Sequence, residues 1–70
     1  MSEVVKRFLD SIAELEGVEY IKRAVAYIST FVPEGKRDEM TLVDFLYELT
    51  GREDVKKYRC ELIAQAMIRC

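Results

Sequence analysis

Residues 18–32, VEYIKRAVAYISTFV, decide how this chain folds. Placed on a helix at about 100° per residue, their apolar side chains cover roughly half of the cylinder. Such a wide apolar face predicts a central helix over residues 18–31 that contacts more than one neighbouring element. Pro33 ends this helix, because the residue before a proline is pushed out of the α region. The apolar face consists of Val18, Tyr20, Ile21, Ala24, Val25, Tyr27, Ile28, Phe31 and Val32.

The residues before this stretch predict an amphipathic helix that starts at Ser2 and stops at Gly17. The Ser2 hydroxyl can accept hydrogen bonds from the free N–H groups of the first turn. Gly17 can end the helix in the left-handed conformation that glycine adopts without strain. The apolar stripe, at helical spacing, consists of Val4, Val5, Phe8, Leu9, Ile12 and Leu15.

Beyond the central helix, residues 33–40 predict a charged loop, since Pro33 and Gly35 bracket a turn. Thr41 is expected to begin a third helix, with Asp44 three residues later imitating a capping box. Gly51 is expected to be the C-cap of that helix. The residues between Thr41 and Gly51 are mostly apolar, which predicts burial on most sides.

A fourth helix is predicted from about Glu53 to the end of the chain. Glu53 and Asp54 place negative charge at its positive end, as the helix dipole favours. Its core stripe consists of Val55, Tyr58, Leu62, Ile63 and Ala66. The apolar residues outside that stripe are Cys60, Ala64, Met67 and Ile68. The last two turns are therefore apolar almost all round.

These segments predict an all-α fold, a small single-domain bundle of about four helices over residues 1–70. A chain of 70 residues has room for one domain, and a composition of 50% apolar and 34% charged residues is typical of globular proteins. No apolar run approaches the ~18 residues of a membrane span, and the charged N-terminus does not resemble a signal peptide. A cytoplasmic location is expected. Lack of Asn with abundant Glu, Lys and Arg is a pattern enriched in thermophilic proteins.

The residues that usually carry catalysis are scarce, and we expect no enzymatic activity, no cofactor and no metal. The chain contains no His, which removes the commonest general base. Its carboxylates fall on polar faces, helix ends or the loop, where solvated charge is the ordinary interpretation. The three glycines are isolated, so no phosphate-binding loop is present. Two Cys cannot complete a zinc site within one chain, although two chains together could supply four.

Cys60 and Cys70 both fall in the predicted fourth helix. Without a general base beside it, Cys60 is expected to be an inert, partly buried thiol. Ten residues of straight helix span about 15 Å, whereas a disulfide requires Cα atoms within about 7 Å. The sequence therefore disfavours a bond between these two residues and leaves open a disulfide between two chains through either of them.

The leading functional hypothesis is a non-catalytic module for protein–protein interaction and assembly. An apolar helix end should not be left in water, so either the fold or a partner must cover it. The simplest partner is a second copy of the chain in a homodimer, and another protein is the alternative. The expected interaction surface consists of Leu62, Ala64, Met67, Ile68 and Cys70.

A small DNA-binding regulator is the alternative hypothesis. The third helix, Gly51 and the fourth helix have the outline of a helix-turn-helix. The possible nucleic-acid contacts are Arg52, Lys56, Lys57 and Arg59. Three features count against this interpretation. Tyr47 stands where the crossing needs a small residue, acidic residues interrupt the basic face, and the net charge of −2 is unusual for a nucleic-acid binder.

Overall fold

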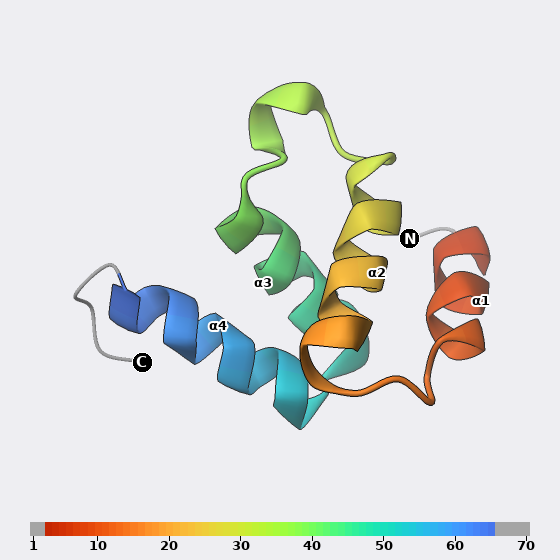
Figure 1. The fold of residues 1–70 in the computed structure, drawn as a ribbon. Coiled ribbons are helices and arrows are strands. Elements are labelled where there is room, and N and C mark those ends of the chain that lie inside the picture. Colours follow the sequence, from red (N-terminus) through yellow and green to blue (C-terminus); the bar gives the residue numbers. More distant parts are fainter. Residues whose placement is uncertain (1–2, 66–70) are drawn as a thin grey trace.

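The computed structural model describes residues 3–65, and this part of the chain forms four α-helices without a β-strand (Figure 1). Helix α1 covers Glu3–Ser11, α2 covers Gly17–Ser29, α3 covers Glu39–Thr50 and α4 covers Glu53–Gln65. One turn of 3₁₀-helix, η1, lies between α2 and α3 at Glu34–Lys36. The predicted all-α bundle of about four helices is confirmed.

Helix α2 is the centre of the fold, because it packs against all three other α-helices. In Figure 1, α1 lies on one side of α2, and α3 and α4 lie on the other. The broad apolar face of residues 18–32 is explained by this arrangement. The buried core consists of Val5, Leu9, Tyr20, Ile21, Ala24, Ile28, Val32, Leu42, Val43, Leu46 and Val55.

Three residues of the predicted apolar faces lie on the surface instead. Val4, Val18 and Phe31 expose 52%, 51% and 53% of their area, respectively. The fold extends over 35 × 29 × 17 Å, so it is only about two helices thick in its thinnest direction. Because the bundle is so thin, it cannot cover the whole apolar surface of every helix.

Helix α1 ends at Ser11, so the prediction that it extends to Gly17 is wrong. After Ser11 the chain tightens, because the N–H groups of Ala13 and Leu15 bond to carbonyls three residues back instead of four. Gly17 has the predicted left-handed conformation, with a φ of 59°, but it is the first residue of α2. The residues between Ser11 and Gly17 therefore form a separate connection, whose carbonyls are free to bind elsewhere in the fold.

Helix α3 starts two residues earlier than expected, and Asp38, not Thr41, is its N-cap. The Asp38 carboxylate accepts hydrogen bonds from the backbone N–H of Thr41, at 3.1 Å, and from its hydroxyl, at 2.7 Å. These bonds hold the pKa of Asp38 below its ordinary value. The predicted loop 33–40 is also partly ordered, because η1 occupies its middle and the Arg37 Nε donates to the Val32 carbonyl at 2.7 Å.

Gly51 ends α3 as predicted, in the left-handed conformation with a φ of 63°. Replacing it with alanine is expected to destabilise the fold by about 1 kcal/mol, because an L-residue is strained there. Gly35→Ala is the matched control, since Gly35 does not have a positive φ. A Cβ at either position would meet no atom within 4 Å, so backbone conformation alone separates the two variants. Urea denaturation measures both, and equal effects would contradict this assignment.

Candidate functional site

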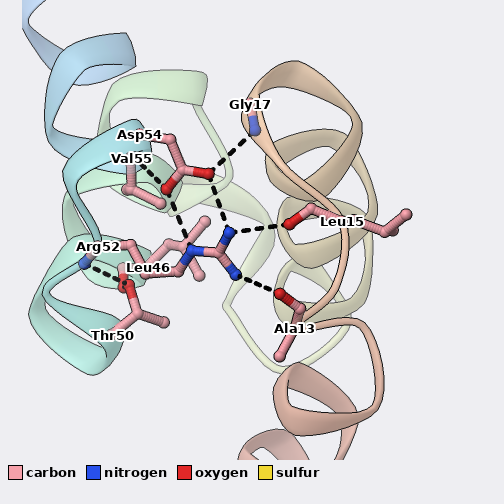
Figure 2. Close-up of polar contacts among 8 residues, drawn as sticks. All are labelled: Ala13, Leu15, Gly17, Leu46, Thr50, Arg52, Asp54 and Val55. Atoms are coloured by element: carbon pink, nitrogen blue, oxygen red, sulfur yellow. Dashed lines mark hydrogen bonds and ion pairs between the residues drawn. The ribbon is translucent and has the colours of Figure 1, made fainter.

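The most extensive polar network in the described residues joins the α1–α2 connection to the α3–α4 turn (Figure 2). Arg52, in the α3–α4 turn, is its centre. Its Nη2 donates to the carbonyl of Leu15 at 2.8 Å, and its Nη1 donates to the carbonyl of Ala13 at 3.3 Å. Both acceptors lie in the segment that was predicted to be the end of the first helix. We call Arg52, Asp54 and their hydrogen-bond partners the Arg52 network.

Asp54, in the first turn of α4, fixes the orientation of Arg52. Its carboxylate accepts from Nε of Arg52 at 3.1 Å and from Nη2 at 3.0 Å, a two-point ion pair. The same carboxylate accepts from the backbone N–H of Gly17 at 3.0 Å and of Val55 at 2.9 Å. Asp54 therefore binds the start of α2 and orders the start of its own helix.

Two further contacts surround the guanidinium group. The carbon at its centre lies 3.6 Å from the ring centroid of buried Tyr20, a cation–π distance. On the backbone side, the Arg52 N–H donates to the Thr50 hydroxyl at 3.3 Å, and that hydroxyl donates to the Leu46 carbonyl at 2.9 Å. The network thus connects the core of α2 with the end of α3.

The ionisation of the network follows from these contacts. Burial by itself would raise the pKa of Asp54, but the Gly17 N–H and the Arg52 guanidinium outweigh it and hold that pKa below its ordinary value. Burial by itself would lower the pKa of Arg52, but Asp54 keeps that pKa above its ordinary value. Burial raises the pKa of Tyr20, and the nearby Arg52 offsets part of that effect. The charged forms of Asp54 and Arg52 therefore stabilise each other.

This ionisation predicts a loss of stability in acid. Since the folded pKa of Asp54 is depressed, its contribution is fully present above the unfolded value of about 3.9. The contribution disappears as the pH falls through the folded pKa. The free energy of unfolding should therefore differ more between the wild type and Asp54→Asn at pH 7 than at pH 2.5. Urea denaturation at both pH values measures this, and a pH-independent difference would show that the charge of Asp54 is unimportant.

The Arg52 network binds parts of the same chain together. Its guanidinium donors are directed at Ala13, Leu15 and Asp54, and both oxygens of Asp54 accept hydrogen bonds. A hollow of about 360 Å³ lies beside it, lined by residues of α1, α2, α3 and the turn that holds Arg52. In the described residues, no group of three His, Cys, Asp or Glu could hold a metal ion. We therefore assign the network a structural role.

The four basic residues considered for DNA binding lie in different environments. Arg52 is part of the network just described, and Arg59 forms an ion pair with Asp44 of α3. Lys56 and Lys57 are exposed on α4. The Tyr58 side chain beside them donates to Glu39 at 2.7 Å, and this hydrogen bond raises its pKa. Two of the four cations are therefore engaged by carboxylates of their own chain.

Of the expected interaction surface, the structure describes only Leu62 and Ala64, and these two residues lie on different sides of α4. Leu62 is half-buried and packs against the core, whereas Ala64 is exposed. Because they are two residues apart on a helix, their side chains point in directions about 160° apart. Met67, Ile68 and Cys70 of that surface lie outside the described residues, as does Ala66 of the predicted core stripe. The outward face of α4 instead consists of Glu53, Lys57, Glu61 and Ala64, all of them exposed.

The expectation of a thiol at Cys60 is wrong, because Cys60 is disulfide-bonded. The described residues contain no free cysteine. Cys70, the other residue considered for a disulfide between chains, lies outside the described residues.

A row of aromatic side chains is a second surface feature. The sequence predicted these residues only as members of the apolar stripes of two helices. The rings of Phe8 and Tyr27 stack with centroids 4.0 Å apart, and Phe31 lies against Tyr27 at 5.4 Å. Phe8 and Tyr27 are half-buried, and Phe31 is more than half exposed. These contacts hold α1 against α2 and leave an apolar edge at the surface.

No helix within residues 3–65 is long and apolar enough to cross a membrane. No protein-family model matches the chain, and neither the curated proteins nor the solved structures compared with it give a significant match.

Proposed function

We propose that this chain is a non-catalytic protein–protein interaction module that associates with a second copy of itself through the outward face of α4. The observation that carries the proposal is the position of this helix. Only α2 and α3 pack extensively against α4, and its far end extends beyond the other helices in Figure 1. Glu61 and Ala64 stand on the exposed side of that end.

The size of the domain gives a reason for such an association. One core of about 70 residues rarely supplies more than about 3–5 kcal/mol of stability. The bundle is also thin, and large apolar side chains remain exposed on it. A second copy bound to the folded state would bury additional surface, and mass action would then increase the apparent stability. The homodimer is the simplest closed assembly that achieves this.

Ala64→Glu tests the proposed surface. The variant keeps a good helix former but adds a charged side chain to the contact, so we expect the dimer to dissociate while helicity is retained. Ala26→Glu is the matched control, because Ala26 is also an exposed alanine within a helix, but on α2. Light scattering on a sizing column gives the mass, and circular dichroism gives the helicity. Equal masses for the two variants would contradict the proposed surface.

DNA binding is the second proposal carried from the sequence, and no observation favours it over self-association. It would depend mainly on the exposed Lys56 and Lys57, since Arg52 and Arg59 pair with carboxylates. The acidic residues Glu53 and Glu61 lie on the same helix and are exposed. A nucleic-acid surface normally concentrates positive charge, whereas this one alternates between the two signs.

A further inference from the structure

The outward face of α4 carries two exposed, oppositely charged residues, Lys57 and Glu61, one helical turn apart. Among residues 3–65, neither forms a salt bridge with another side chain of its own chain. Along the helix, the positive charge comes before the negative one. A second copy of the helix that runs in the opposite direction presents a negative charge opposite the positive one, and a positive charge opposite the negative one. Two copies of this face in antiparallel orientation would place each Lys57 opposite the partner's Glu61. A parallel orientation would place like charges together.

An apolar depression borders these two charges. A hollow of about 280 Å³ between α2 and α4 is lined in part by Val18, Ile21 and Tyr58, with Lys57 and Glu61 at the same site. Val18 exposes 51% of its area there, although it lies at the start of the central helix. The surface therefore combines apolar area with charges of both signs, so two copies of it can present opposite charges to each other across a two-fold axis.

We propose that a second copy of this chain docks here across a two-fold axis, with the two α4 helices antiparallel and centred near residue 59. This inference deepens the self-association proposed above and depends on it. In the dimer, Lys57 of each copy pairs with Glu61 of the other, and the paired helices cover Val18 from both copies. The same axis brings Ala64 near Glu53 of the opposite copy. Ala64→Glu therefore dissociates the dimer by charge repulsion, whereas Ala64→Lys retains it.

Two single charge reversals and their mixture test the arrangement. Lys57→Glu gives a copy with two negative charges at these positions, and Glu61→Lys gives one with two positive charges. Each variant alone replaces two attractive contacts across the axis with two repulsive ones. We expect about a tenfold weaker dimer for each at low salt. An equimolar mixture restores two attractive pairs, so its dimer affinity should return to at least the wild-type level.

Sedimentation equilibrium without reductant measures these affinities for the full chain, because the structure has Cys60 of α4 in a disulfide. Lys6→Glu is the control, because Lys6 is exposed on α1, which lies across α2 from α4 (Figure 1). It should dimerise as the wild type does. In 1 M salt, where the screening length is about 3 Å, the single variants should approach the wild type.

The failures of the two proposals can be distinguished. Suppose that the wild type dimerises, but the charge variants dimerise with unchanged affinity or their mixture does not recover the wild-type affinity. That result would overturn the antiparallel arrangement but would still support self-association. A wild type that remains monomeric at every concentration would overturn both.

Discussion

Replacing Arg52 with alanine is expected to lower the free energy of unfolding by about 2–3 kcal/mol, or the melting temperature by roughly 10–20 °C. The substitution leaves the Asp54 carboxylate without its cation and the carbonyls of Ala13 and Leu15 without their donor. Truncating one partner of a fully buried pair costs more, but both side chains here are 24% exposed, which moderates the loss. The cost arises mainly from the groups left without partners.

The matched control for this prediction is Arg59→Ala. Arg59 also pairs with an aspartate, Asp44, but the two side chains are 37% and 42% exposed. Solvent screens such a pair, so its removal should cost less than about 1 kcal/mol. Arg52→Lys is the informative intermediate, because lysine keeps the charge but cannot bond to two carbonyls and a carboxylate in one plane. Thermal and urea unfolding measure all three, and equal losses for Arg52→Ala and Arg59→Ala would contradict the special position of Arg52.

Leu46→Ala is expected to have the largest effect, a loss of about 2–5 kcal/mol. Leu46 is fully buried in α3 and belongs to the central core cluster. The change removes apolar contacts and leaves a cavity among neighbours that can relax only in part. Since one core of this size supplies only about 3–5 kcal/mol, the remaining stability is small and part of the population should unfold at 25 °C. Circular dichroism without denaturant would show this as a weaker helical signal than that of the wild type.

Leu49→Ala is the control within the same helix. Leu49 is half-buried and packs at the edge of the core, so the same truncation removes fewer contacts. We expect a folded protein with a lower midpoint in urea. If Leu46→Ala were as stable as Leu49→Ala, α3 would not be the buried element described here.

Most of the fold could be predicted from local patterns. The wide apolar face of residues 18–32 was sufficient to identify the central helix, because its 3.6-residue period depends only on neighbouring residues. The C-cap at Gly51 was predicted for the same reason, since a left-handed residue after an apolar helix is a local feature. The end of α1 was not predictable in this way. Its apolar stripe continues to Leu15, although the hydrogen-bonded helix stops at Ser11.

The Arg52 network was missed because its acceptors are 37 and 39 residues away in the sequence. Arg52 and Asp54 each had a reasonable local interpretation, as a possible DNA contact and as a favourable charge at a helix start. Their ion pair two residues apart was the only local signal, and it does not identify the partner carbonyls. Asp38 was also missed as the N-cap of α3, because the sequence pattern was interpreted with Thr41 at the helix start and both side chains can accept from a free N–H group.

The outward face of α4 was only partly predictable. The sequence placed Leu62 and Ala64 on one interaction surface because the helix end is apolar nearly all round. The structure assigns Leu62 to the core, so the exposed face is more polar than expected and includes Lys57 and Glu61. The predicted core stripe did place Val55, Tyr58 and Leu62 on the inward side of this helix, and all three lie in the core or pack against it. The packing partners were needed only to decide between core and interaction surface for Leu62, which the sequence had assigned to both.

The proposed function depends most on whether the chain associates with itself. The direct measurement is the mass of the wild-type protein by light scattering on a sizing column, with and without reductant and over a range of concentrations. We predict a mass that rises with concentration to twice the chain mass of 8.2 kDa. A mass of one chain at every concentration would contradict self-association and the antiparallel contact inferred from it.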